Sequence, residues 1–247
     1  MIILNSITKK TITIGATTLL LSSYIGVPTE VMSLENPQII IRVGEYQNKP
    51  GKRLDNVSSD FEIDCPVRYE NGVYSVREYD MNYKVANAIV KYLESQGINV
   101  LLQDTKDKSE DLNGAGRKAK SYNPDIYLSI HHNYYNEDSE GYFLMYNQGD
   151  IQSEKYAKNI SNALTSKPML VPQRQNHAIS GYIGELNLCP GDINLLAEMG
   201  FFSNPTECKK CVDDEQVDFI ARTMGNELIQ ILNEINNSKG EMQLWQI

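Results

Sequence analysis

The chain has 247 residues, with 23 Lys and Arg against 32 Asp and Glu, and a formal net charge of -9. Hydrophobic residues make up 41% of it and charged residues 22%, which is typical of a globular protein and excludes wholesale disorder and collagen-like repeats. An acidic chain lacks the cationic surface that attracts phosphate backbones, so we expect no nucleic acid partner. With only three histidines, a metal site must use His131, His132 or His177, or else carboxylates and cysteines.

The first 33 residues differ from the rest. Lys9 and Lys10 precede an uncharged stretch, 11–29, that contains three consecutive leucines, and the small Ser33 offers a cleavage site. This pattern predicts a secretory signal peptide over residues 1–33 and hence a secreted protein. An uncleaved membrane anchor is the alternative, because the stretch approaches the ~18 apolar residues that can span a bilayer.

Strand-like and helix-like stretches alternate after the leader. The expected strands are 39–43, 98–102, 126–130, 142–146 and 193–197, and the expected helices are 81–97, 111–122, 152–164 and 213–236. The long segment Gly44 to Arg77 contains glycine and proline breakers, so we expect an irregular functional loop there. The alternation predicts one α/β domain over residues 34–237, with a twisted, largely parallel sheet flanked by helices on both faces. Residues 238–247 are expected to form a C-terminal tail.

Polar residues follow three of the expected strands. Glu45 follows the first strand, His131 the strand at 126–130, and Glu198 the strand at 193–197. Glu78, at the start of a helix, can reach the same region. In open α/β sheets, ligands collect outside the carboxyl ends of the strands. Carboxylates that converge with an imidazole suit a divalent metal such as zinc, with one carboxylate left over as a base.

Each of these residues also has a purely structural interpretation. Glu78 alone could be a favourable carboxylate at a helix N-terminus, and His131 alone could be a hydrogen-bonded histidine at a strand end. His131 and His132 point to opposite faces of the strand, so only one of them can address a given site. Glu198 is harder to explain structurally, because an unpaired buried charge is costly.

Two motifs resemble those of a known family. Ser-Ile-His-His-Asn at 129–133 and Glu-Met-Gly-Phe-Phe-Ser-Asn at 198–204 are similar to motifs of the zinc-dependent N-acetylmuramoyl-L-alanine amidases of bacterial cell walls. Glu78, with Asn82 after it, resembles the segment that brings the second metal ligand of the family. Arg117 falls where these amidases have an arginine ahead of the histidine strand.

The resemblance spans roughly residues 38–236 and implies a secreted peptidoglycan hydrolase that cleaves the amide between N-acetylmuramic acid and L-alanine. It implies that His131 and Glu78 bind zinc, that Glu198 is the catalytic carboxylate, and that Asn133 and Arg117 contact the substrate. Peptidoglycan is thus the expected partner. A dinucleotide cofactor is not expected, because the chain has no glycine-rich nucleotide-binding pattern.

The chain departs from the family at the first strand. The family has Asp-Pro-Gly-His there, with the histidine as the first zinc ligand, whereas this chain has Arg42-Val43-Gly44-Glu45. Glu45 could bind the metal through oxygen, a ligand that zinc tolerates, and the enzyme would then be active or weakly active. Alternatively, the chain is a metal-free pseudo-amidase that binds peptidoglycan or a protein partner. We favour the enzyme.

The cysteines and the third histidine give weaker signals. Cys208 and Cys211 form a C-x-x-C pair far from the place a thioredoxin-like motif requires. With Cys65 and Cys189 they could bind zinc, but we favour incidental thiols or one disulfide formed after export. His177 lies in a polar stretch, where a solvated loop histidine is favoured over one that reaches the substrate.

Overall fold

The computed structural model describes residues 13–14, 17–18, 36–46, 53–55, 67–70, 73–104, 112–166, 177–189 and 191–244. The chain divides into two units, Met1–Met32 and Ser33–Ile247. In the first unit, β1 (Thr13–Ile14) and β2 (Thr17–Thr18) pair antiparallel. The rest of the predicted signal peptide lies outside the described residues. Among the residues described, no helix has the length and apolar character needed to cross a membrane.

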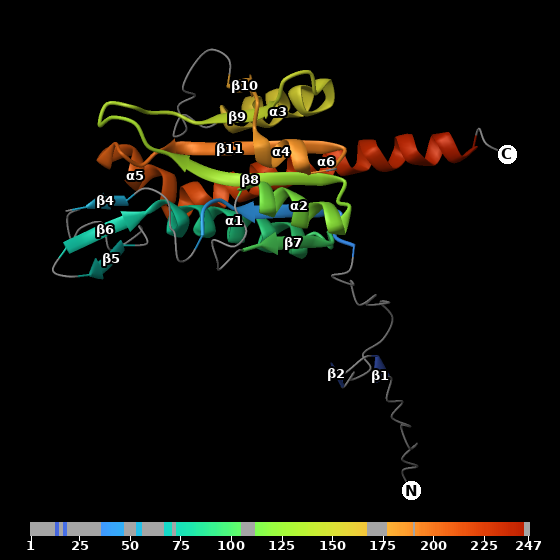
Figure 1. The fold of residues 1–247 in the computed structure, drawn as a ribbon, viewed down its shortest axis with the longest axis horizontal. Helices are drawn as coiled ribbons and strands as arrows, with labels where there is room; N and C mark the ends of the chain where they lie inside the picture. The colour runs from blue at the N-terminus through green and yellow to red at the C-terminus, as the bar shows by residue number, and fades with distance from the viewer. Residues whose placement is uncertain are drawn as a thin grey trace, which may run out of the picture. The chain divides into compact units, whose positions relative to one another are not determined.

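A six-stranded sheet forms the centre of the second unit (Figure 1). Its strands are β3 (Ile39–Val43), β7 (Val100–Gln103), β8 (Ile126–Asn133), β9 (Phe143–Asn147), β10 (Ala178–Gly181) and β11 (Ile193–Phe201). They lie in the order β10-β9-β11-β8-β3-β7, and every neighbouring pair is parallel except β9 and β11. The predicted largely parallel sheet is therefore confirmed.

Helices cover both faces of this sheet. They are α1 (Glu78–Ser95), α2 (Leu112–Tyr122), α3 (Ile151–Leu164), α4 (Gly184–Leu188), α5 (Pro205–Val212) and α6 (Asp214–Leu244). Ile39, Ile41 and Leu128 belong to the larger core, which α1, α3 and α6 share. Ile40 and Tyr127 belong to the smaller core of α2 and α4. Alternate strand residues thus enter different cores, as the period of two in a strand requires.

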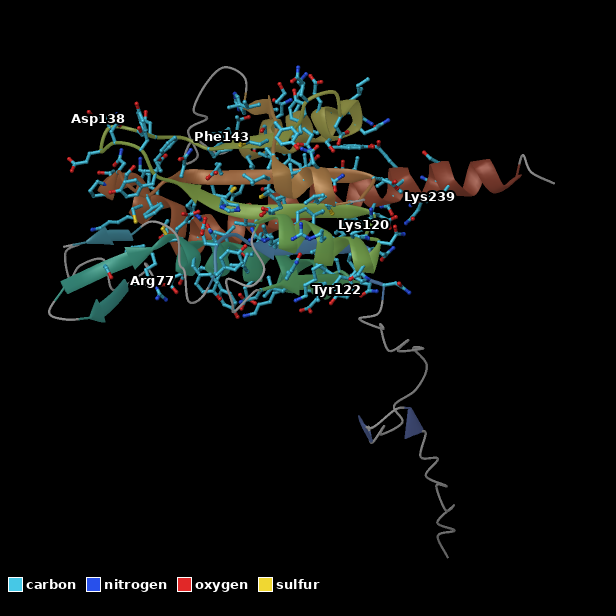
Figure 2. The ribbon with its side chains drawn as sticks, in the orientation of Figure 1. Arg77, Lys120, Tyr122, Asp138, Phe143 and Lys239 are labelled. Atoms are coloured by element: carbon cyan, nitrogen blue, oxygen red, sulfur yellow. The ribbon has the colours of Figure 1, made fainter. Side chains whose placement is uncertain are left out.

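The segment from Gly44 to Arg77 contains a second sheet, so the expectation of an irregular loop was wrong. β4 (Arg53–Asp55), β5 (Val67–Glu70) and β6 (Val73–Arg77) pair antiparallel in the order β4-β6-β5. These strands are short and carry charged residues, so their apolar alternation is weak. Arg77, labelled in Figure 2, ends β6, and α1 begins at the next residue. The start of α1 is therefore fixed by the small sheet.

The C-terminal helix is longer than expected, and residues 238–244 continue it instead of forming a tail. It extends beyond the strands in Figure 1. The expectation failed because most of the added residues are good helix formers, and because Lys239 (Figure 2) makes ion pairs with Asp125 and Asp192 at 2.5 and 2.9 Å. Three further elements, β10, α4 and α5, were not expected from the sequence.

The packing of α1 against α6 requires a glycine. A Cβ at Gly225 would overlap the ring of Tyr92, whose hydroxyl donates to Asn226 Oδ1 at 2.6 Å. We predict that Gly225→Ala lowers the free energy of unfolding by about 1–3 kcal/mol, because either the Tyr92 ring or the helix that carries it must move. Chemical denaturation measures this change.

Gly240→Ala in the same helix is the matched control, since nothing lies within 4 Å of a Cβ there. It should leave stability unchanged or raise it by up to about 1 kcal/mol through helix propensity. Equal losses in the two variants would contradict the packing argument.

Candidate active site

Strand register brings the predicted site residues to one edge of the sheet. Arg42 pairs with Ser129 and Val43 with Ile130 between β3 and β8, while Glu198 of β11 lies opposite His131 of β8. The three strands are mutually parallel, so their carboxyl ends meet at this edge. Glu45, two residues beyond β3, lies there as well.

Glu45, Glu78 and His131 form a cluster that could hold a metal ion. One potential ligand atom from each lies within 4.8 Å of the others, and His131 Nδ1 is 3.2 Å from Glu78 Oε1. Ligand atoms about 2.0–2.1 Å from a tetrahedral zinc ion are about 3.3 Å apart. Glu78 and His131 are buried and Glu45 is half-buried. The donor set and the spacing of this pair therefore fit a divalent cation with oxygen and nitrogen ligands.

Gly44 allows the end of β3 to approach β8. Its N–H donates to Ile130 O at 2.8 Å, and a Cβ on it would overlap that carbonyl and lie 2.7 Å from the His131 ring. The next residue, Glu45, has a φ of 62°, a left-handed conformation that is uncommon for glutamate and costs about 1–3 kcal/mol. The strained turn is what places Glu45 beside Glu78 and His131.

Asn82 of α1 connects this turn to the other histidine. Its side-chain amide donates to Gly44 O at 3.1 Å, and its Oδ1 accepts from His132 Nδ1 at 2.8 Å. Burial, together with the charge of His131, lowers the pKa of His132 to about 3, so His132 is neutral. His132 thus supports the turn from outside the cluster, and its neighbour His131 belongs to the cluster.

Glu198 lies beside the cluster with an unusual carboxyl group. Its Oε2 is buried and has no hydrogen-bond partner within the described part of the chain. Burial raises its pKa to about 7; the charge of His131 opposes this shift, and Glu78 and Glu45 add to it. A carboxyl group with such a pKa can both accept and release a proton near neutral pH.

Arg42 stands where the family resemblance predicts aspartate, and its side chain is fully buried. Its Nη1 forms an ion pair with Glu185 Oε2 at 3.2 Å and lies 3.3 Å from both Ser129 Oγ and His131 Nε2. Tyr127 donates its hydroxyl to the other oxygen of Glu185. Burial disfavours the charged form of Arg42. The nearby carboxylate of Glu185, more than any other group, outweighs this effect and holds the pKa of Arg42 above its ordinary value.

This network was not predicted from the sequence. An arginine within a β-branched strand is a signal for a buried carboxylate partner, because an unpaired buried charge is costly. The partner could not be identified, because Glu185 lies in α4, a five-residue helix that the periodicity did not reveal.

The remaining residues named from the sequence lie as follows. Asn133 accepts a hydrogen bond from Tyr134 N at 2.8 Å, and Arg117 is exposed on α2. The His177 ring packs edge-on against Tyr142, outside the cluster. Cys189 and Cys208 are buried free thiols, so no disulfide joins these two. Cys65 and the side chain of Cys211 lie outside the described residues.

A comparison with protein families identifies the chain. Residues 67–230 match the sequence model described as N-acetylmuramoyl-L-alanine amidase. The chain belongs to this family. Its members hydrolyse the amide bond between N-acetylmuramic acid and L-alanine, so the predicted family and class of enzyme are confirmed. The matched range begins after Arg42-Val43-Gly44-Glu45 and does not include it.

Solved structures share the fold at low sequence identity. The N-acetylmuramoyl-L-alanine amidase from Clostridium difficile 630 superposes with a TM-score of 0.63 at 17% identity, covering 81% of this chain and 98% of its own. The catalytic domain of the amidase CwlV from Bacillus (Paenibacillus) polymyxa var. colistinus gives 0.63 at 16%, covering 80% and 98%. The CwlD amidase from Clostridioides difficile, solved with the GerS lipoprotein, gives 0.60 at 21%, covering 80% and 99%. No curated protein matches the chain.

The close approach of Gly44 to His131 is testable. We predict that Gly44→Ala lowers the free energy of unfolding by about 1–3 kcal/mol and displaces the ring of His131, because neither the Ile130 carbonyl nor that ring can yield without moving β8. Denaturation and the affinity for divalent zinc measure the two effects. Gly181→Ala is the control, because the nearest atom to its Cβ would be the flexible end of Met145 at 3.6 Å. A stable Gly44→Ala protein with unchanged zinc affinity would contradict this account.

Proposed function

We propose that this amidase cleaves its substrate with the help of a zinc ion held by Glu45, Glu78 and His131, and that Glu198 moves the proton. The observation that carries the proposal is the convergence of two carboxylates and one imidazole beside a third carboxylate that has no hydrogen-bond partner on Oε2 among the described residues. Zinc, when bound, supplies a Lewis acid that polarises the scissile carbonyl and makes water more acidic.

The protein's own groups have separate tasks in this proposal. Glu198 accepts a proton from the attacking water and passes it to the amine of L-alanine as the amide breaks, which its pKa of about 7 permits. Asn82 holds the Gly44 carbonyl and so the turn that carries Glu45. Small displacements of such groups are costly to catalysis, because the reacting atoms must be aligned.

Glu45 changes the charge of the site relative to a histidine. Two carboxylates neutralise a divalent zinc ion, whereas one carboxylate leaves a charge of +1. Water at the neutral site should be less acidic, so we expect a slower enzyme or one with a higher pH optimum than a site with two histidines. A metal-free protein that binds peptidoglycan or a protein partner is the alternative.

Secretion is part of the same proposal. Peptidoglycan lies outside the cytoplasmic membrane, and the first 33 residues have the pattern of a signal peptide. An uncleaved leader would instead anchor the protein at the membrane.

The role of Glu198 can be tested with Glu198→Gln. We predict a loss of about 10²–10⁴-fold in the rate at which L-alanine amino termini appear in peptidoglycan, because the amide cannot accept a proton. Zinc affinity should remain, since Glu198 is not among the three ligands. Glu137→Gln, at an exposed glutamate, is the control and should keep full activity. A Glu198→Gln protein as active as the control would refute the assignment.

Glu45→His separates the enzyme from the pseudo-amidase. If Glu45 binds the metal, the native protein releases L-alanine amino termini, chelation abolishes this activity, and Glu45→His shifts the active range to lower pH because the site gains positive charge. A native protein without zinc or activity, in which Glu45→His creates both, would establish the pseudo-amidase instead.

A further inference from the structure

His131 has an unusual neighbour on the ring nitrogen that does not contact Glu78. Its Nδ1 lies next to Glu78, whereas its Nε2 lies 3.3 Å from Arg42 Nη1. Histidines that bind metals nearly always donate the second ring N–H to a carboxylate, a carbonyl or water, which orients the ring and raises its basicity. Here that position is taken by a guanidinium, which has five N–H donors and no acceptor.

The contact favours one position for the proton of a neutral His131. Arg42 offers no acceptor for a hydrogen on Nε2, and the two hydrogens of its Nη1 already point to Ser129 and Glu185, so the ring proton is better placed on Nδ1, toward Glu78. A metal bound through Nδ1 requires the opposite tautomer, with the hydrogen on Nε2. That hydrogen would face an N–H of Arg42, and two donors would then oppose each other inside the protein.

Arg42 has little freedom to avoid this conflict. It is fully buried, its Nη1 is paired with Glu185 and lies beside Ser129, and its guanidinium carbon lies 5.7 Å from the centre of the Tyr46 ring. Tyr127 holds Glu185 in turn. The positive charge of Arg42 also repels a metal cation bound at His131, and the carboxylate of Glu185 offsets part of that repulsion.

We propose that Arg42 is a positioning residue that weakens metal binding at His131, by holding its imidazole in the tautomer that carries the proton on Nδ1. The proposal rests on the metal site proposed above. It assigns to the Arg42–Glu185 pair control over how tightly this amidase holds its metal. Glu185 acts in the opposite direction to Arg42, because its carboxylate offsets the guanidinium charge.

The test measures zinc affinity by competition with a chelator at mildly alkaline pH, in wild type, Arg42→Gln, Arg42→Lys and Glu185→Gln. Glutamine removes the charge and leaves room for an amide or a water to accept the Nε2 hydrogen, so we expect zinc to bind about tenfold more tightly. Lysine keeps the charge and only donates, so affinity should not change. Glu185→Gln should bind zinc more weakly. Thermal unfolding establishes that each variant is folded.

Arg42→Gln and Glu185→Gln are expected to change zinc affinity in opposite directions. A merely structural role of these residues would instead weaken zinc binding in every variant. The double variant Arg42→Gln/Glu185→Gln removes both charges, and it must bind zinc more tightly than Arg42→Lys even if a single variant does not fold. An Arg42→Gln protein that binds zinc no more tightly than wild type, or an Arg42→Lys protein that gains equally, would overturn the inference.

The results also distinguish this inference from the proposed function. Zinc bound by wild type with no gain in Arg42→Gln refutes the inference alone. Zinc bound only by Arg42→Gln supports the inference and refutes a metal-dependent native enzyme. Zinc bound by no variant refutes both.

Discussion

The parallel pairing of β8 with β3 on one side and β11 on the other is the constraint on which the site depends. It aligns the carboxyl ends of the three strands, so that groups far apart in the sequence reach one edge of the sheet. Because strand side chains alternate between faces, Arg42, Ser129, His131 and Glu198 lie on the face covered by α2 and α4. The opposite face supplies most of the apolar core.

The pairing alone would not complete the cluster. Glu78 comes from the first residue of α1, whose start is determined by β6, and Glu45 comes from a turn that is possible because residue 44 is a glycine. Asn82 holds that turn from the same helix. The site therefore depends on two junctions, strand to turn and strand to helix, in which a shift of one residue would turn a ligand away.

Much of the fold and part of the candidate site could be predicted from the sequence. The runs at 39–43 and 126–130 each have four apolar or aromatic residues out of five, so the strands that carry the site were expected, and their parallel pairing brings Glu45 and His131 to one edge. The small sheet and α4 were missed because they are short and polar. Glu185 was missed with α4, since a contact between residues 143 positions apart leaves no periodic signal in the chain.

The central question is whether the native protein holds a metal at Glu45, Glu78 and His131. The most direct test is elemental analysis of the full chain as purified, combined with anomalous diffraction from its crystals at the zinc absorption edge. We predict one zinc ion per chain, held by Glu45, Glu78 and His131. Protein with no metal at this position after incubation with zinc, or with zinc bound elsewhere, would contradict the account.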